Sequence, residues 1–155
     1  MNISMIRSRD ILTPELRAKI AKTKAPKKAL EAMGLAVVSM TQRAFTQPAL
    51  RISAWAPLKP ATIKAKNRAG FGSKTLISSG SLAHSPRVTS LTSKAVTVGS
   101  DRKVGGYSLA GIHQLGTTSI PARPFFPFDA QGRASARAAK NIKTAARAAL
   151  ALERR

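Results

Sequence analysis

Acidic residues are scarce in this sequence of 155 residues. It has 6 Asp and Glu against 27 Lys and Arg, which gives a formal net charge of +21. Such an excess of one sign favours a polyanionic partner: nucleic acid first, an anionic membrane surface second and an acidic protein third. The acids are also scattered along the chain, which leaves no nearby pair of carboxylates for general acid–base catalysis.

Cysteine is absent, which excludes a disulfide framework, a thiolate nucleophile and a cysteine metal site. The histidines, His84 and His113, lie far apart in the sequence, and no glycine-rich phosphate loop has a known spacing. We therefore expect no metal and no cofactor. No apolar run approaches the length of a membrane span, and residues 1–12 lack the apolar segment of a secretory signal. We expect a soluble cytoplasmic product with no membrane partner.

A hydrophobic content of 43% is enough for a folded core. The length predicts one domain over residues 1–155, with a flexible N-terminus at 1–12. Thr13 followed by Pro14 is a good helix start, and Pro26 is expected to begin a second helix that ends before Pro48. Apolar residues in this second helix recur in steps of three and four, and we expect it to be the main core helix. They are Leu30, Met33, Val37, Met40 and Ala44, with Leu35, Val38 and Phe45 widening the stripe.

Residues 48–80 look irregular and form a long arm. Trp55 and Leu58 are expected to anchor it, and a short basic helix is expected from Pro60 to Lys66. The alternation around Val96 and Val98 then predicts strands at residues 85–90 and 94–99, which flank a polar turn.

The stretch from Ile112 to Phe128 is stiff and apolar. It holds three of the five phenylalanines within four residues. Because proline fixes φ and removes an amide donor, we expect a rigid loop and edge strand rather than the middle of a helix. The residues expected to act here in packing and subunit contact, without catalysis, are His113, Gln114, Arg123, Phe125 and Phe126.

A C-terminal helix is expected over residues 130–152, which are rich in Ala, Arg and Lys. At about 100° per residue, its basic residues occupy an arc of roughly 120°, opposite a thin apolar face. The five members of this basic stripe are Arg133, Arg137, Lys140, Lys143 and Arg147. A stripe of charge is often only a solvated helix face, but such faces normally mix signs. We therefore expect these five residues to face a polyanion, DNA first, with a solvated face or an acidic protein as the alternative.

Several segments, in order, carry a resemblance to a known family. They include Trp55-Ala56-Pro57-Leu58, Ser79-Gly80-Ser81-Leu82, Val96-Thr97-Val98-Gly99, Ile112-His113-Gln114-Leu115-Gly116 and Ile120-Pro121-Ala122-Arg123-Pro124-Phe125-Phe126. Over residues 30–128 the sequence resembles the phage virion morphogenesis family, the tail-completion group that includes the phage Mu G-like and phage P2 S-like proteins. It departs from the family pattern after Pro48, where no glycine turn precedes the tryptophan, and at residues 108–111, which separate Tyr107 from Ile112.

The resemblance implies a non-enzymatic structural protein of the virion that acts where heads and tails are joined. It implies that the fold class is α+β, with helices packed on a small antiparallel sheet. It implies a homo-oligomeric ring around the DNA exit channel, which we expect to be a hexamer, with a dodecamer as the alternative. Its partners would then be itself, neighbouring head–tail connector and tail proteins, and genomic DNA. A second hypothesis is a free nucleic-acid-binding protein that grips phosphates without reading bases. A third is an enzyme, in which a serine–histidine–aspartate site would have to use His113.

Overall fold

The computed structural model describes residues 11–23 and 25–152. Within this part of the chain it has five α-helices, one 3-10 turn and two small antiparallel sheets of two strands each, so the predicted α+β class is confirmed. The elements are α1 (Pro14–Lys22), α2 (Pro26–Arg43), η1 (Pro48–Leu50), α3 (Pro60–Arg68), β1 (Arg87–Leu91), β2 (Val96–Gly99), β3 (Lys103–Val104), β4 (Tyr107–Ser108), α4 (Leu109–Leu115) and α5 (Ala136–Leu152). The N-terminus expected to be flexible lies largely outside the described residues; Ile11 and Leu12 are half-buried against the core.

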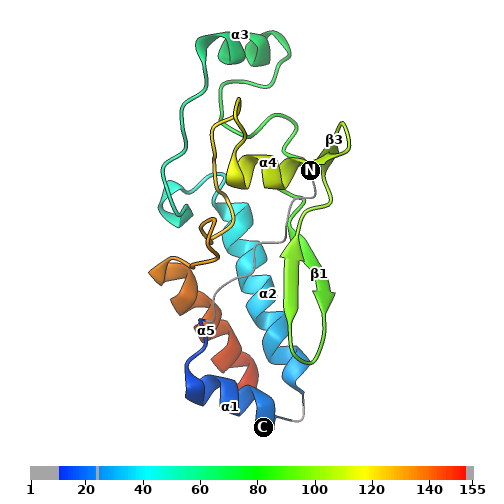
Figure 1. The fold of residues 1–155 in the computed structure, drawn as a ribbon, viewed down its shortest axis with the longest axis vertical. Coiled ribbons are helices and arrows are strands. Elements are labelled where there is room, and N and C mark those ends of the chain that lie inside the picture. Colours follow the sequence, from blue (N-terminus) through cyan, green and yellow to red (C-terminus); the bar gives the residue numbers. More distant parts are fainter. Residues whose placement is uncertain (1–10, 24, 153–155) are drawn as a thin grey trace.

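Helix α2 is the central element of the fold. Figure 1 shows α5 along one side of it, the β1–β2 hairpin along another, and α1 across the lower ends of α2 and α5. All five residues of the predicted stripe on this helix are buried, which confirms it as the main core helix. Leu35 is the exception to the wider stripe: its side chain is 55% exposed, so the expectation that it joins the core is wrong.

Both helix starts predicted from proline are confirmed. The side chain of Thr13 caps α1 by accepting a hydrogen bond from the backbone N–H of Leu16, and Pro26 occupies the first turn of α2. Proline is tolerated there because the first-turn amide has no partner within the helix. Helix α3 likewise begins at Pro60 and runs two residues further than expected, to Arg68.

The β1–β2 hairpin packs on α2, and a bulge in β1 sets which of its side chains face the helix. Val88 pairs with Val98, but Ser90 pairs with Thr97, so the register shifts at Thr89. Without that extra residue, Val88 and Leu91 would point to opposite faces of the strand. With it, Leu91 packs against the core beside Val96 and Val98, while Val88 reaches Gly34 on α2.

The stretch from Ile112 to Phe128 differs from expectation at its start. Ile112 to Leu115 form the end of α4, a short helix that the sequence did not predict. Ser108 caps it through a hydrogen bond from the N–H of Gly111, so residues 108–111 form the cap and first turn. The chain after Gly116 runs without regular structure to Phe128, where an isolated bridge to Ala134 replaces the expected edge strand.

The C-terminal helix begins at Ala136, six residues after the predicted start at Ala130. Asp129 holds a turn by accepting hydrogen bonds from the backbone N–H groups of Gln131 and Arg133, and Gly132 has φ +75°. Ser135 then accepts from the N–H of Ala138 and caps the helix. The local turn and cap therefore override the helix propensity of Ala130 and its neighbours.

Candidate assembly and nucleic-acid interface

An aromatic cluster lies at the upper end of α2. The ring of Phe125, which is 1% exposed, lies 5.0 Å from the ring of Phe45 and 5.0 Å from that of Phe126. Trp55 meets Phe45 edge to face at 5.7 Å. The structure thus brings Trp55, Phe125 and Phe126 together, as their shared role in packing requires. Leu58 is half-buried, and among the described residues it belongs to neither of the two hydrophobic core clusters.

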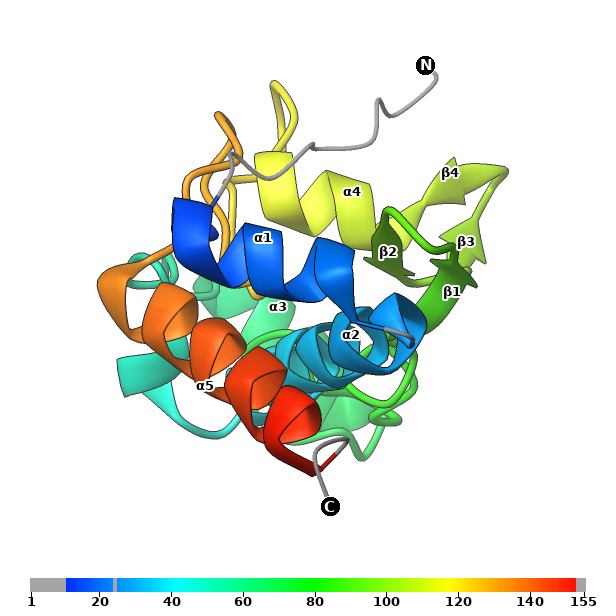
Figure 2. The same ribbon diagram turned by 90° about the horizontal axis from the view of Figure 1, so that it is seen from below.

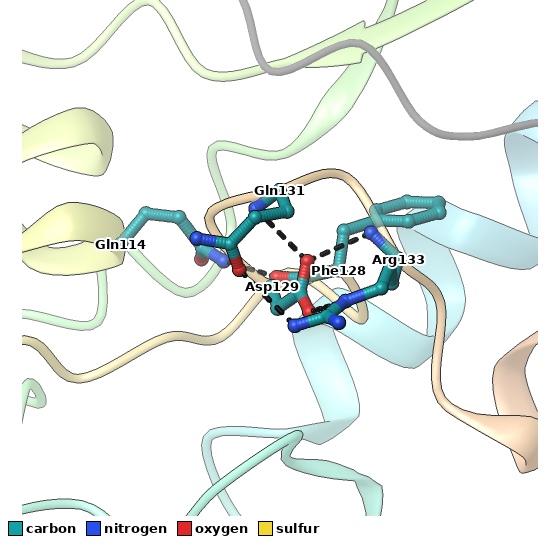
Figure 3. Close-up of polar contacts among 5 residues, drawn as sticks. All are labelled: Gln114, Phe128, Asp129, Gln131 and Arg133. Atoms are coloured by element: carbon teal, nitrogen blue, oxygen red, sulfur yellow. Dashed lines mark hydrogen bonds and ion pairs between the residues drawn. The ribbon is translucent and has the colours of Figure 1, made fainter.

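Gln114 holds the phenylalanine segment against α4. Its Oε1 accepts hydrogen bonds from the backbone N–H groups of Phe125 (3.1 Å) and Phe126 (3.0 Å), and its Nε2 donates to the carbonyl oxygen of Phe128 at 2.7 Å. The residue is 7% exposed. Figure 3 shows the last of these bonds beside the Asp129 turn. A stretch rich in proline cannot satisfy its amides within a sheet, so a buried side chain does so instead.

Arg123 ties the same segment to the start of the arm. Its Nε donates to the carbonyl oxygen of Ala56 at 2.8 Å and its Nη2 to that of Pro57 at 3.0 Å. In return, the indole Nε1 of Trp55 donates to the carbonyl oxygen of Pro124 at 2.7 Å. Residues 55–57 and 123–124 are therefore fastened by three side-chain hydrogen bonds, which we call the arm clip.

Arg51, the residue that follows η1, links the arm clip to the end of α2. Its guanidinium lies 3.7 Å from the centre of the Trp55 ring and donates to the carbonyl oxygens of Ala44 and Phe45. Partial burial lowers the pKa of Arg51. Sequence reasoning missed this residue, because its partners are backbone carbonyls exposed where α2 ends.

His113 is half-buried on α4, and its Nδ1 atom is shielded from solvent. Its Nδ1 has no hydrogen-bond partner among the described residues, and its carbonyl oxygen accepts from the N–H of Arg123. Burial lowers the pKa of His113, and the charge of Arg123 lowers it further. A neutral imidazole is therefore favoured, which suits packing beside a cation.

The arm itself stands away from the helices. Figure 1 places α3 at the far upper end of the molecule, and α3 buries no residue. Lys66 Nζ donates to the carbonyl oxygens of Lys74 and Ile77, which closes the loop below the helix, and partial burial lowers its pKa. At the tip, Phe71 is 46% exposed. The β3–β4 hairpin also presents exposed apolar side chains, Val104 and Tyr107.

The structure divides the predicted basic stripe. Arg137, Lys140 and Arg147 are exposed on α5 and Lys143 is half-buried there, while Ala138, Ile142 and Ala146 are buried on the opposite side. Arg133 is not on the helix. It lies in the preceding turn, where its Nε forms a 2.6 Å ion pair with Asp129, so its place in the helical stripe was predicted wrongly. Backbone and side-chain hydrogen bonds from Arg133 lower the pKa of Asp129.

Comparison with protein families identifies the chain. The model of the phage virion morphogenesis family matches residues 9–155. This protein belongs to the phage virion morphogenesis family. The match confirms the resemblance drawn from residues 30–128 and extends it, because it includes the C-terminal helix that the motifs left outside. Comparisons with curated proteins and with solved structures give no match.

Among residues 11–23 and 25–152, no group of three or more metal-ligating side chains lies close enough to hold an ion. Within the same residues, no helix has the length and apolarity needed to cross a membrane. A role in building the virion is the kind of function that membership of this family supports.

Proposed function

We propose that this protein is a head–tail joining, tail-completion component that forms a homo-oligomeric ring around the DNA exit channel. The observation that carries the proposal is the one-sign exposed face of α5 on a member of a virion morphogenesis family. Arg137, Lys140 and Arg147 are exposed there, while the opposite face docks on α2. The protein would be made in the host cytoplasm and function at the head–tail interface as a structural, non-enzymatic part.

The arm and the β3–β4 hairpin are the proposed subunit contacts. Each presents an aromatic side chain to solvent, Phe71 and Tyr107, on a segment that extends from the helices (Figure 1). Contiguous exposed apolar side chains, such as Val104 and Tyr107 on the hairpin, mark association surfaces more strongly than single ones do. A head-to-tail contact of this kind closes a ring when its rotation closes. We propose six-fold closure, with twelve-fold as the alternative, in contact with the neighbouring connector and tail proteins.

Genomic DNA is the proposed partner of the basic face of α5, defined as Arg137, Lys140, Lys143 and Arg147. Repetition of the face around a ring would line the channel with positive charge. Contacts would be to phosphates, because a channel must pass any sequence. Binding should then weaken with salt, with a log–log slope of about 0.9 per phosphate neutralised.

Charge reversal tests this placement. The double variant Arg137→Glu with Lys140→Glu should lower the affinity for duplex DNA in solution and the retention of DNA in assembled heads. Lys94→Glu with Arg102→Glu is the matched control, because both side chains are exposed and belong to the turns before and after β2, not to α5. If both variants bind and retain DNA equally, the basic face does not contact DNA. If tail joining fails while DNA affinity is unchanged, the face contacts an acidic protein instead.

A free nucleic-acid-binding protein is the second candidate function. The basic arm favours it, since Lys64 and Arg68 are exposed on α3 near Phe71. Against it, Trp55, Phe125 and Phe126 pack together in the cluster, whereas single-strand binders present aromatic rings to bases. Electron microscopy of the particle neck separates the two: a ring of copies supports the joining role, and a neck without this protein would refute it.

A further inference from the structure

A groove lies at the base of the molecule, at the opposite end from the arm. The residues that form it come from α1, the start of α2 and the last turns of α5. Figure 2 shows the arrangement of these three helices from below. Its volume is about 890 Å³. The residues that line this basal groove are Thr13, Glu15, Leu16, Lys19, Lys22, Thr23, Ala25, Lys28, Arg147, Leu150 and Ala151.

The lining combines apolar and cationic groups. Leu16 is buried and Leu150 half-buried, so the groove has an aliphatic floor. Lys19, Lys22, Lys28 and Arg147 surround it, and Glu15 supplies the one carboxylate among the described lining residues. Hydrogen bonds from its own backbone N–H and from Thr13 lower the pKa of Glu15, so the carboxylate stays charged at neutral pH. The groove therefore keeps a clear excess of positive charge.

We propose that the basal groove docks an acidic segment of another protein that carries aliphatic side chains such as leucine. Charge complementarity argues for the acidic residues, and the floor of Leu16 and Leu150 argues for the aliphatic ones. Arg147 belongs to both the basic face of α5 and the groove, but Lys19, Lys22 and Lys28 lie outside that face. The docking therefore does not rest on the ring or on DNA contact, and it goes beyond the proposed function.

This chain cannot supply such a segment. Its six acids are dispersed among 27 basic residues, and no stretch of it is acidic. A second copy would bring positive charge to a positive groove, which opposes binding. The occupant must therefore come from a different chain.

Nucleic acid fits the groove less well than a peptide. A duplex contacts proteins through phosphates on a convex backbone and would leave an aliphatic floor unused. A single strand gains affinity by stacking bases on aromatic rings, and the lining residues include none. The same floor is suited to leucine side chains, which bury apolar area.

Fluorescence anisotropy on the full-length protein tests the proposal. The probe is a short labelled helical peptide of glutamate and leucine; the comparison probes are a glutamate–serine peptide of equal charge and a duplex DNA. We expect the leucine peptide to bind at least about tenfold more tightly than the serine peptide. Equal binding of the two peptides, or no binding of the leucine peptide, would overturn the proposal, since a role for the floor requires the difference.

Two variants locate the binding. Lys22→Glu with Lys28→Glu should weaken peptide binding by at least about tenfold, whereas the matched Lys94→Glu with Arg102→Glu should change it much less. Ala151→Gln keeps the charge and adds bulk to an exposed lining position on α5, so it should also weaken the peptide complex without disturbing the fold. If these variants lower the affinity for duplex DNA as much as the affinity for the peptide, the groove is a nucleic-acid surface and the proposal is wrong.

Discussion

The indole Nε1 of Trp55 donates a 2.7 Å hydrogen bond to the carbonyl oxygen of Pro124, a residue 69 positions further along the chain. Arg123, the neighbour of Pro124, returns two hydrogen bonds to the carbonyl oxygens beside Trp55. The arm clip thus joins two segments that lack regular structure through side-chain donors to backbone acceptors. It fixes the root of the arm while leaving α3 free of buried contacts.

Removing the indole donor should loosen the arm. Trp55→Phe keeps an aromatic ring beside Phe45 and Arg51 but leaves the Pro124 carbonyl without its donor, so we expect a loss of about 1 kcal/mol in the free energy of unfolding. We also expect faster trypsin cleavage at Lys64 and Arg68 on α3, measured by mass spectrometry under native conditions. Ser53→Ala, at an exposed position nearby, is the control. Equal cleavage rates in the two variants would show that the clip does not restrain the arm.

Phe125 should be the most costly aromatic side chain to truncate. It is 1% exposed between Phe45 and Phe126, so Phe125→Ala should lower the free energy of unfolding by about 3–5 kcal/mol, measured by urea denaturation. Phe71→Ala makes the same chemical change at a side chain that is 46% exposed, and should cost no more than about 0.5 kcal/mol. Similar costs at both sites would contradict the assignment of Phe125 to the core.

The parts of the fold that sequence could predict are those fixed by local periodicity or capping. Leu30, Met33 and Val37 recur at the helical period, so the buried face of α2 could be read directly. Thr13 and Pro26 mark the starts of α1 and α2 because a capping threonine and a first-turn proline are local signals. The basic face of α5 was also predictable, because steps of three and four from Arg137 to Arg147 need only helical geometry.

The parts that sequence could not predict depend on distant partners. Helix α4 is seven residues long and includes Gly111, so its propensity is weak; the three bonds of Gln114 to the phenylalanine segment hold it. The carbonyl oxygens that accept hydrogen bonds from Arg123 belong to residues 66 and 67 positions away in the sequence. The displacement of Arg133 from α5 had a readable signal, since Asp129 and Gly132 mark a turn before the helix.

Stability should fall below neutral pH because of His113. Its pKa is lowered in the folded protein by burial and by Arg123, whereas the unfolded chain has the ordinary value of about 6.5. As pH falls through that value, the unfolded chain binds a proton more readily than the folded one, so the folded state loses stability. His113→Phe removes this titration. The difference in unfolding free energy between about pH 7.5 and about pH 5.5 should be smaller in the variant than in the parent protein. An unchanged difference would show that His113 is not the titrating group.

Gly34 should resist replacement even though it lies within a helix. Alanine is favoured over glycine in a helix by about 1 kcal/mol, so an exposed Gly→Ala change normally stabilises. Here a Cβ on residue 34 would lie 2.6 Å from Cγ2 of Val96 and 3.0 Å from Cγ2 of Val88. The hairpin would have to shift away from α2, and overpacking of this kind costs about 1–3 kcal/mol. Gly34→Ala should therefore lower the free energy of unfolding.

Truncating Val96, the side chain that faces Gly34, should show whether crowding causes the stability loss of Gly34→Ala. In Val96→Ala the Cγ2 atom is gone, so adding Gly34→Ala to it should cost less than adding Gly34→Ala to the parent protein. A double-mutant cycle by urea denaturation measures this coupling, which should be about 0.5–3 kcal/mol for residues in direct contact. Thr97→Ala, at the next position of β2, is the control because Gly34 does not meet its side chain within the nearest contacts. Additive costs for Gly34→Ala and Val96→Ala would mean that close approach of α2 and β2 is not why this position is glycine.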